Sequence, residues 1–192
     1  MINIDNYEIF KNNLSTLKEI SKDDSEAIVE YMTKSTLSAI NFDGVKTEYL
    51  KFFHLSDELS KSCDGLLCFN DKDILIEFKN GESIKPSDIK IKIKESLLIL
   101  TAIITQDEIL EIKNKGVFIL VYNKDKNPIT TQEIKQKDIE EAPSSQYIKQ
   151  YIFKKSGKEF IRYGLEKFEK YFNKVHTYCQ EEFEEYIKQF KN

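Results

Sequence analysis

The sequence is poor in the residues that build zinc sites. It contains two histidines, three cysteines and no Cys-x-x-Cys pair. His54 and His176 lie far apart in the chain, whereas zinc ligands usually stand at short, regular spacings. An odd number of cysteines in a charge-rich chain also gives no disulfide framework. We therefore expect reduced, mostly buried thiols in a cytoplasmic protein, and no zinc site built from Cys and His.

Long apolar segments are missing as well. The chain has no run of about 18 apolar residues, the length that a membrane-spanning helix needs. Its first residues, MINIDNYEIFKNN, lack the basic segment and the apolar stretch of a secretion signal. The sequence therefore predicts a protein that neither spans a membrane nor carries a signal peptide.

An excess of positive charge is also absent. The net charge is −4, and Arg162 is the only arginine. Proteins that coat nucleic acid regardless of its sequence are usually strongly basic, and guanine is usually recognised by arginine. The positive charge is local instead, because lysines cluster after a predicted hairpin: Lys79, Lys85, Lys90, Lys92 and Lys94. Any contact with phosphate groups is therefore expected at such local clusters.

The composition is that of a globular protein. Of the 192 residues, 40% are hydrophobic and 12% are aromatic, which excludes a disordered chain. This length suits one domain with a sizeable core, and no internal repeat divides it. We predict a single domain over residues 1–192, with a core at 24–124 and a helical extension at 129–192.

Apolar spacing predicts the elements before residue 63. It indicates a helix over residues 7–20 and a second helix from Ser21, as its N-cap, to about residue 41. Residues 45–53 are predicted as a strand, and residues 56–62 as a turn or a short helix.

Stronger patterns follow residue 63. Residues 63–79 are predicted as a hairpin, residues 86–104 as a long helix and residues 117–122 as a buried strand. This order indicates an α/β fold, a mixed central β-sheet flanked by helices. The last third is predicted to be mostly helical, with helices at 146–153 and 158–168, a short strand at 171–177 and a capping box at Thr177 before a final helix.

The second strand of the hairpin carries charge where burial is expected. Ile74-Leu75-Ile76-Glu77-Phe78-Lys79 places a carboxylate and an ammonium inside an apolar segment. Buried charge is costly unless it is paired or binds an ion. The charged residues of this strand are therefore candidates for a functional site.

The register of the hairpin would bring three of the polar residues together. With a tight turn of two or four residues, Phe69 faces Ile74 and Asp64 faces Lys79. Because every second residue returns to the same face of a strand, Asp64, Glu77 and Lys79 would then share one face. A three-residue turn would shift the register and separate them.

These three side chains have the chemistry of a phosphodiester-cleaving site. Two neighbouring carboxylates repel each other and attract a cation, and hard oxygen ligands suit Mg²⁺ or Mn²⁺. Such a metal polarises a phosphate and lowers the pKa of bound water. An adjacent lysine can orient that water or neutralise the developing negative charge.

Asp64, followed after a turn by Glu77-Phe78-Lys79 at the end of an apolar strand, resembles the PD-(D/E)XK nuclease superfamily over residues 24–124. The resemblance implies a restriction-endonuclease-like fold and a metal-dependent nuclease with Mg²⁺ or Mn²⁺ as cofactor. It implies Asp64, Glu77 and Lys79 as catalytic residues. It also implies that Asp64 and Glu77 are metal ligands, together with the Phe78 carbonyl and Glu30 or Glu26. Lys90 and Lys94 are implied as substrate-binding residues.

Less specific interpretations stay open. Asp64 and Lys79 could form a cross-strand ion pair at a solvated sheet end, which is common and contributes little stability. The superfamily also includes members that have lost activity and only bind partners, so a non-catalytic binding module, such as an inhibitory or toxin-neutralising protein, is the alternative function. The partners expected are nucleic acid, either DNA or RNA, and, in the alternative, a protein or a second copy of the chain.

Overall fold

The computed structural model describes residues 1–25, 28–69, 71–129 and 160–190. Its main sheet consists of β1 (Leu14–Thr16), β4 (Ser38–Asn41), β5 (Gly65–Phe69), β6 (Lys72–Lys79), β7 (Val117–Tyr122) and β8 (Lys174–Cys179). A second, two-stranded sheet consists of β2 (Lys22–Asp23) and β3 (Glu30–Tyr31). The α-helices are α1 (Glu8–Asn12), α2 (Leu17–Ile20), α3 (Phe42–Phe52), α4 (Pro86–Ile103), α5 (Gln106–Lys115) and α8 (Gln180–Ile187). The 3-10 helices are η1 (Ile4–Asn6), η2 (Asp57–Leu59), η3 (Leu165–Lys170) and η4 (Lys188–Phe190).

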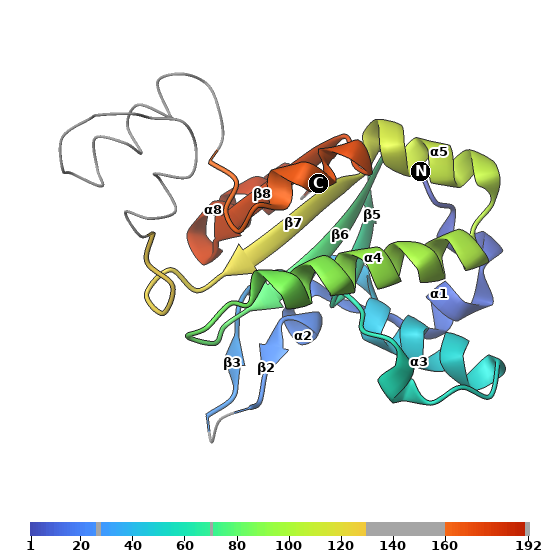
Figure 1. Ribbon diagram of the computed structural model, residues 1–192, viewed down its shortest axis with the longest axis horizontal. Coiled ribbons are helices and arrows are strands. Elements are labelled where there is room, and N and C mark those ends of the chain that lie inside the picture. Colours follow the sequence, from blue (N-terminus) through green and yellow to red (C-terminus); the bar gives the residue numbers. More distant parts are fainter. Residues whose placement is uncertain (26–27, 70, 130–159, 191–192) are drawn as a thin grey trace.

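The main sheet is mixed, with strand order β1-β4-β5-β6-β7-β8. The strands from β1 to β6 are antiparallel to their neighbours, whereas β6, β7 and β8 run parallel. Parallel neighbours need a long crossover connection, and α4 and α5 provide it between β6 and β7 (Figure 1). The predicted α/β class with a mixed central sheet is confirmed.

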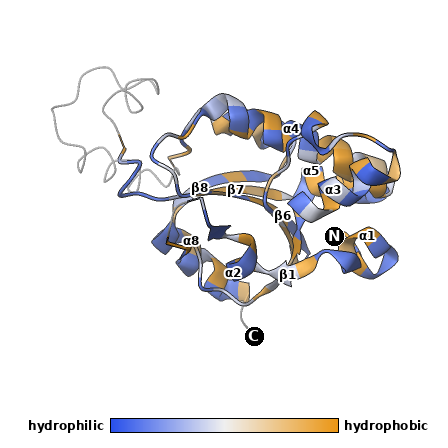
Figure 2. Ribbon diagram, turned by 90° about the horizontal axis from the view of Figure 1, so that it is seen from below, coloured by the Kyte–Doolittle hydropathy of each residue, from blue (hydrophilic) through white to orange (hydrophobic). Residues whose placement is uncertain are grey.

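Helices cover both faces of the sheet (Figure 2). On one face, α3, α4 and α5 pack over a core that includes Leu66, Leu75 and Leu120. On the other face, α2 and α8 pack over a second core that includes Leu67, Ile76 and Val121. The central strand β6 is therefore buried on both sides, and its side chains alternate between the two cores.

This burial explains the apolar run around Glu77. Residues 73–78 of β6 are all buried, so neither face of the strand meets open solvent. Glu77 shares the face of Leu75, because side chains two residues apart point the same way. Glu77 therefore lies under the layer formed by α3 and α4, and the expectation of a solvated sheet end does not hold for it.

Several predictions before residue 63 are wrong. The predicted helix over 7–20 is interrupted, because β1 pairs with β4 at residues 14–16. Instead of a second helix, residues 21–41 hold the short strands β2, β3 and β4. Helical spacing of the apolar residues was present here, but pairing between distant segments decided the structure.

The predicted strand over residues 45–53 is also wrong, because these residues belong to α3. The side chain of Asn41 accepts the N–H of Gly44 at 3.3 Å and so caps this helix. The sequence Asn41-Phe42-Asp43-Gly44 therefore starts a helix, although the apolar pattern predicts that a helix ends there. The turn or short helix predicted over residues 56–62 is found as the 3-10 helix η2.

The hairpin exists, but its register differs by two residues from the prediction. Phe69 pairs with Lys72, not with Ile74. Asp71 adopts a left-handed conformation with φ of 65°, which Asp tolerates better than most residues. A shift of two residues keeps each side chain on its face, and it moves Asp64 from opposite Lys79 to opposite Glu77.

The C-terminal part of the chain completes the sheet. The predicted strand over 171–177 is found as β8, slightly later in the sequence. The capping box also lies later than Thr177, because the Glu182 carboxylate accepts the N–H of Cys179 at 2.9 Å at the start of α8. The predicted helix over 146–153 lies outside the described residues. The predicted helix over 158–168 is wrong for most of its described part, because residues 160–164 are not helical and the 3-10 helix η3 begins only at Leu165.

No helix in the described part of the chain combines the length and the apolar character needed to cross a membrane.

Candidate functional site

Four charged side chains meet where β5, β6 and α4 come together. Asp64 directly precedes β5, Glu77 and Lys79 lie in β6, and Lys92 lies in the second turn of α4. The structure therefore brings together the three residues that the hairpin pattern singled out, and it adds a second lysine. We call these four residues the carboxylate–lysine cluster.

Both lysines contact the same oxygen of Glu77. The ammonium of Lys79 lies 2.7 Å from Oε1, and that of Lys92 lies 2.8 Å from it. Lys92 also lies 3.3 Å from Oδ1 of Asp64 and so bridges the two carboxylates. The other oxygen of Glu77, Oε2, is buried and has no hydrogen-bond partner among the described residues.

The backbone around the cluster fixes Asp64 in place. The N–H of Asp64 donates to the carbonyl oxygen of Ile76 at 3.0 Å, and its Oδ2 accepts the N–H of Phe78 at 2.6 Å. On the helix side, Oγ of Ser96 accepts the N–H of Cys63 at 2.8 Å. Because Ser96 stands one turn after Lys92, one face of α4 holds the segment that leads into β5.

Burial controls the charge state of Glu77. Its side chain is 0% exposed. Burial, and then the nearby charge of Asp64, raise the pKa of Glu77 to about 7, although Lys92 and Lys79 act to lower it. Burial favours the neutral form of a carboxylic acid, whereas an adjacent cation favours the charged form. The two ammonium groups therefore do not fully compensate the cost of burying this carboxylate.

The partners of Glu77 have shifted pKa values as well. Burial raises the pKa of Asp64, although Lys92 and the Phe78 N–H act to lower it. Burial disfavours the charged form of Lys92, but the charges of Asp64 and Glu77 outweigh this effect and raise its pKa. Lys92 is therefore a permanent cation, and Glu77 is the member of the cluster that titrates near neutral pH.

One side of the cluster opens into a pocket of about 370 Å³. Asp64, Phe78 and Lys79 line it from the sheet, and Asp43 lines it from the first turn of α3. On the opposite side it is bounded by residues 20–23, which include Lys22 and Asp23. Lys79 is 30% exposed, so a molecule in this pocket could reach its ammonium group.

Glu30 lies near this pocket without joining the cluster. It belongs to β3, not to a helix, and its carboxylate accepts a hydrogen bond from the Asn80 side chain at 2.6 Å. Asn80 also donates to Asp23 at 2.9 Å. The carboxylate of Glu30 is therefore held by the residue that follows β6. Glu26, the other candidate for this position, lies outside the described residues.

Lys90 and Lys94 are placed away from the cluster. They line a different pocket, together with Lys167 and Lys170 of η3. Because successive residues of a helix are about 100° apart, Lys92 points to the opposite side of α4 from both. The structure therefore does not bring these two lysines next to Glu77, and their contact with a substrate stays a prediction.

Sequence reasoning missed two residues of the site, Lys92 and Asp43. Lys92 was one member of a lysine cluster, and the signal that distinguishes it is its helical position one turn before Ser96. Asp43 lies where the apolar pattern predicts the end of a helix, so no local signal places it beside Asp64. The hydroxyl of Ser62 donates to the carboxylate of Asp43.

The donor set fits a small, hard cation. Among the described residues, no group of three or more His, Cys, Asp or Glu side chains is arranged to hold a metal ion. Mg²⁺, however, often binds through one or two carboxylates and keeps several waters. Asp64 and Glu77 provide such a pair, and the buried Oε2 of Glu77 is an oxygen that lacks a partner.

Comparisons of the chain with protein-family models, with curated proteins and with solved structures find no significant match. The function of the site therefore has to be inferred from its own geometry and chemistry.

Proposed function

We propose that the protein is a metal-dependent nuclease that hydrolyses phosphodiester bonds with the carboxylate–lysine cluster. The observation that carries this proposal is the state of Glu77. A fully buried carboxylate with one unpartnered oxygen costs folding free energy, and a second carboxylate beside it adds to the cost. Such an arrangement is expected where a cation binds during function.

Asp64 and Glu77 would hold the Mg²⁺ or Mn²⁺ ion, and the carbonyl of Phe78 is a third candidate ligand. When bound, the ion supplies Lewis-acid chemistry toward a phosphodiester and lowers the pKa of bound water. The protein itself would position the two carboxylates and limit the access of water to them. Phe78 fixes the Asp64 carboxylate through its N–H, and burial keeps bulk water away from Glu77.

The two lysines have different environments, which supports different roles. Lys79 is 30% exposed at the pocket, so its ammonium can hold a phosphate oxygen or the attacking water. Lys92 is 19% exposed and bridges Asp64 and Glu77. Its place suggests that it balances the carboxylates when no metal is bound and moves aside when a metal enters.

The order of elements supports the same proposal. Around the cluster, the chain runs α3, η2, β5, β6, α4, α5, β7. Apart from the short η2 and the second crossover helix α5, this is the helix, strands, helix, strand order expected for the PD-(D/E)XK superfamily. A restriction-endonuclease-like core and nucleic acid as substrate are part of the proposal. Among the described residues, two lysines line the pocket beside the cluster, Lys22 and Lys79, so few phosphates would be contacted directly there.

A second candidate function has an observation of its own. Because Lys92 already bridges both carboxylates at 2.8 and 3.3 Å, it could serve as a built-in cation in place of a metal. The cluster would then be structural, and the protein would be a non-catalytic binding module on the same fold.

A cleavage assay separates the two functions. Labelled single-stranded and double-stranded DNA and RNA are incubated with the protein and Mg²⁺ or Mn²⁺. We expect metal-dependent cleavage by the wild type and a loss of about 10²–10³ in rate in Lys79→Ala, the usual effect of removing one preorganised charged group. Lys51→Ala, at an exposed position of α3, serves as the control.

Binding of Mn²⁺ is measured on the wild type, on Lys79→Ala and on Glu77→Ala. Lys79→Ala should still bind the metal, because an ammonium group is not a ligand, whereas Glu77→Ala should not. A wild type that cleaves none of these substrates and binds no metal would favour the non-catalytic module.

A further inference from the structure

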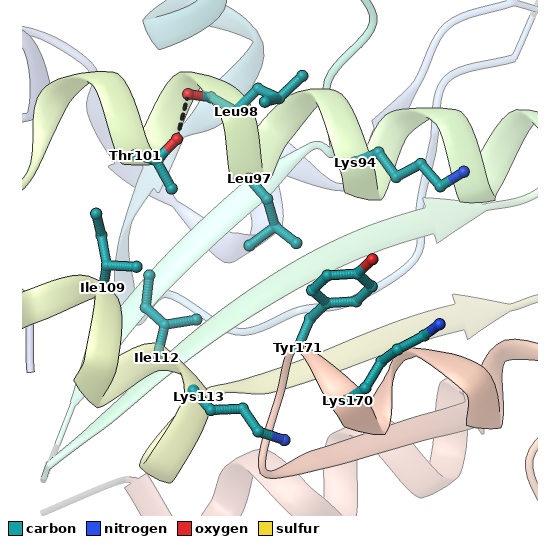
Figure 3. A pocket seen from close by; sticks show the side chains of 9 residues that line it. All are labelled: Lys94, Leu97, Leu98, Thr101, Ile109, Ile112, Lys113, Lys170 and Tyr171. Carbon is teal, nitrogen blue, oxygen red and sulfur yellow. Dashed lines mark hydrogen bonds between the residues drawn. The ribbon is translucent and has the colours of Figure 1, made fainter. Parts of the chain in front are cut away.

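An open apolar groove lies on the other side of α4 from the cluster. It has a volume of about 510 Å³ and is formed by α4, α5 and the segment that follows η3 (Figure 3). Leu97 from α4 and Ile109 and Ile112 from α5 surround the same hollow, and the ring of Tyr171 closes one end. We call this surface the lysine-rimmed groove.

The rim of the groove is positively charged. Lys94, Lys113 and Lys170 line it, and the described part of its lining contains no acidic residue. A smaller hollow of about 230 Å³ continues from it and adds Lys90 and Lys167. The described residues offer no ion-pair partner to Lys90, Lys94, Lys167 or Lys170, while Lys113 donates to the carbonyl oxygen of Glu169 at 2.8 Å.

The groove is open along its length. Leu98, on its edge, is 68% exposed, and Tyr171 is 45% exposed. Sites for small ligands usually enclose most of the ligand, and this groove does not. Exposed leucine and tyrosine beside an apolar hollow are instead typical of surfaces that contact another macromolecule.

We propose that the lysine-rimmed groove binds an acidic amphipathic helix of a partner protein. A groove with an apolar floor between two helices matches the recognition mode in which the apolar face of a helix packs into the groove. The lysines on both sides match acidic residues that flank such an apolar face. Charge complementarity of this kind increases the association rate and the specificity.

Other occupants fit less well. Nucleic acid would pair its phosphates with the lysines, but it would leave the floor of Leu97, Ile109 and Ile112 in contact with sugar and phosphate. A second copy of the chain would bring two lysine-rich rims together, and like charges repel. The proposal does not depend on the nuclease proposal, because Lys92 and the cluster lie on the opposite side of α4.

The test uses the full chain and three fluorescent probes. The first probe is a designed helical peptide with leucine and phenylalanine on one face and glutamate on the other. The second is a peptide of the same composition in scrambled order, and the third is a single-stranded DNA of similar charge. Binding is followed by fluorescence anisotropy over a range of salt concentrations, and self-association by analytical ultracentrifugation.

Two groove variants have matched controls. Leu98→Asp places a charge at the edge of the groove, and Leu59→Asp does so at a leucine of η2 that is similarly exposed at 65%. Lys94→Glu combined with Lys170→Glu reverses the rim charge, and Lys34→Glu combined with Lys51→Glu reverses two exposed lysines elsewhere. All four variants change exposed or rim side chains, so the fold is expected to persist, and circular dichroism verifies it.

We expect the amphipathic peptide to bind, and each groove variant to weaken its binding by at least about tenfold, because a new acidic side chain then faces an acidic ligand. The control variants should change binding by less than about twofold. Added salt should weaken binding by the wild type. Four results would overturn the proposal: no peptide binding, equal binding of the scrambled peptide, preference for the DNA with loss in the same groove variants, or dimers that only the groove variants dissociate.

Discussion

The state of the Glu77 side chain is the most informative feature at the scale of single residues. It is fully buried, it shares one oxygen between two lysines, and its other oxygen has no partner in the described part of the chain. Most buried carboxylates in proteins are satisfied by hydrogen bonds or ion pairs. Glu77 is only partly satisfied, so the cluster stores an electrostatic cost that a divalent cation would relieve.

This cost should appear in the pH dependence of stability of the metal-free protein. The folded pKa of Glu77 is about 7, against 4.5 for the unfolded chain. Between these values the folded state binds more protons, so stability falls as pH rises from 4.5 to 7. The loss amounts to about 3 kcal/mol for a shift of this size.

Urea unfolding across this pH range measures the effect in the wild type and in Glu77→Gln. The side chain of the variant stays neutral, so the stability of the variant should fall much less between pH 4.5 and 7. Equal slopes in the two proteins would show that Glu77 is ionised throughout and that the lysines compensate it.

Lys92 provides a second test at this scale. Lys92→Met leaves Asp64 and Glu77 without their bridging cation, and removal of one partner of a buried ion pair typically costs about 3–5 kcal/mol. Because Glu77 can take up a proton, we expect a smaller loss of unfolding free energy, about 1–3 kcal/mol at pH 8. At pH 5, where Glu77 is already protonated, the loss should be smaller still. Mn²⁺ should restore part of the stability.

The matched control is Lys94→Met, on the same helix but without an ion pair among the described residues. Its free energy of unfolding should lie within about 0.5 kcal/mol of the wild-type value. If Mn²⁺ stabilises neither the wild type nor Lys92→Met, the cluster is a closed ion-pair network.

The sequence predicted the members of the site better than their pairing. Asp64, Glu77 and Lys79 converge because alternation along a strand is a local property that survives a register shift of two residues. Their partner Lys92 depends on how α4 lies across the sheet, which no local pattern contains. The position of Lys90 and Lys94 on the other side of α4 follows from the same packing.

At the scale of elements, the junction between α5 and β7 has little space. A Cβ atom on Gly116 would lie 2.3 Å from the carbonyl oxygen of Ile112, which accepts the Gly116 N–H at 2.8 Å. Gly116→Ala should therefore displace the end of α5 or the start of β7. We expect a loss of about 1–3 kcal/mol, the usual cost of overpacking.

Gly81→Ala is the control, because a Cβ at Gly81 meets nothing within 4 Å. It should change the free energy of unfolding by less than about 0.5 kcal/mol. Thermal or urea unfolding of both variants gives the comparison, and equal stability of the two would show that the junction adjusts without cost.

Elements with strong local patterns were predicted, and elements that depend on distant partners were not. The apolar run at 117–122 and the stripe of α4 specify β7 and α4 by themselves. In contrast, β1 and β4 have three and four residues, too few for alternation to be visible. They form because β1 pairs with β4 and β4 pairs with β5.

At the scale of the whole molecule, the sheet links both ends of the chain. Its strands extend from Leu14 to Cys179, and β8 covers the edge of β7. Phe183, Ile187 and Phe190, which follow β8, are all buried in the second core. The described part of the C-terminal third is thus part of the core, so a stable unit confined to residues 24–124 is not expected.

A chain that ends at residue 129 should therefore not fold stably. Burial of the three side chains contributes about 5–9 kcal/mol at roughly 1.5–3 kcal/mol each, which is comparable with the total stability of a domain, about 5–15 kcal/mol. We expect the full chain to melt in one cooperative transition and the shortened chain to show none. Cooperative melting of the shortened chain near the temperature of the full chain would indicate two separate units.

The central claim is that Asp64 and Glu77 form a cation site, and a crystal structure of the full chain soaked in Mn²⁺ tests it most directly. Anomalous diffraction locates Mn²⁺ without reference to the surrounding side chains. We predict a peak between the two carboxylates, within about 2.0–2.3 Å of their oxygens as for small hard cations, with the Lys92 ammonium displaced from Oε1 of Glu77. No peak there at saturating Mn²⁺, with both lysines still on Glu77, would contradict the account.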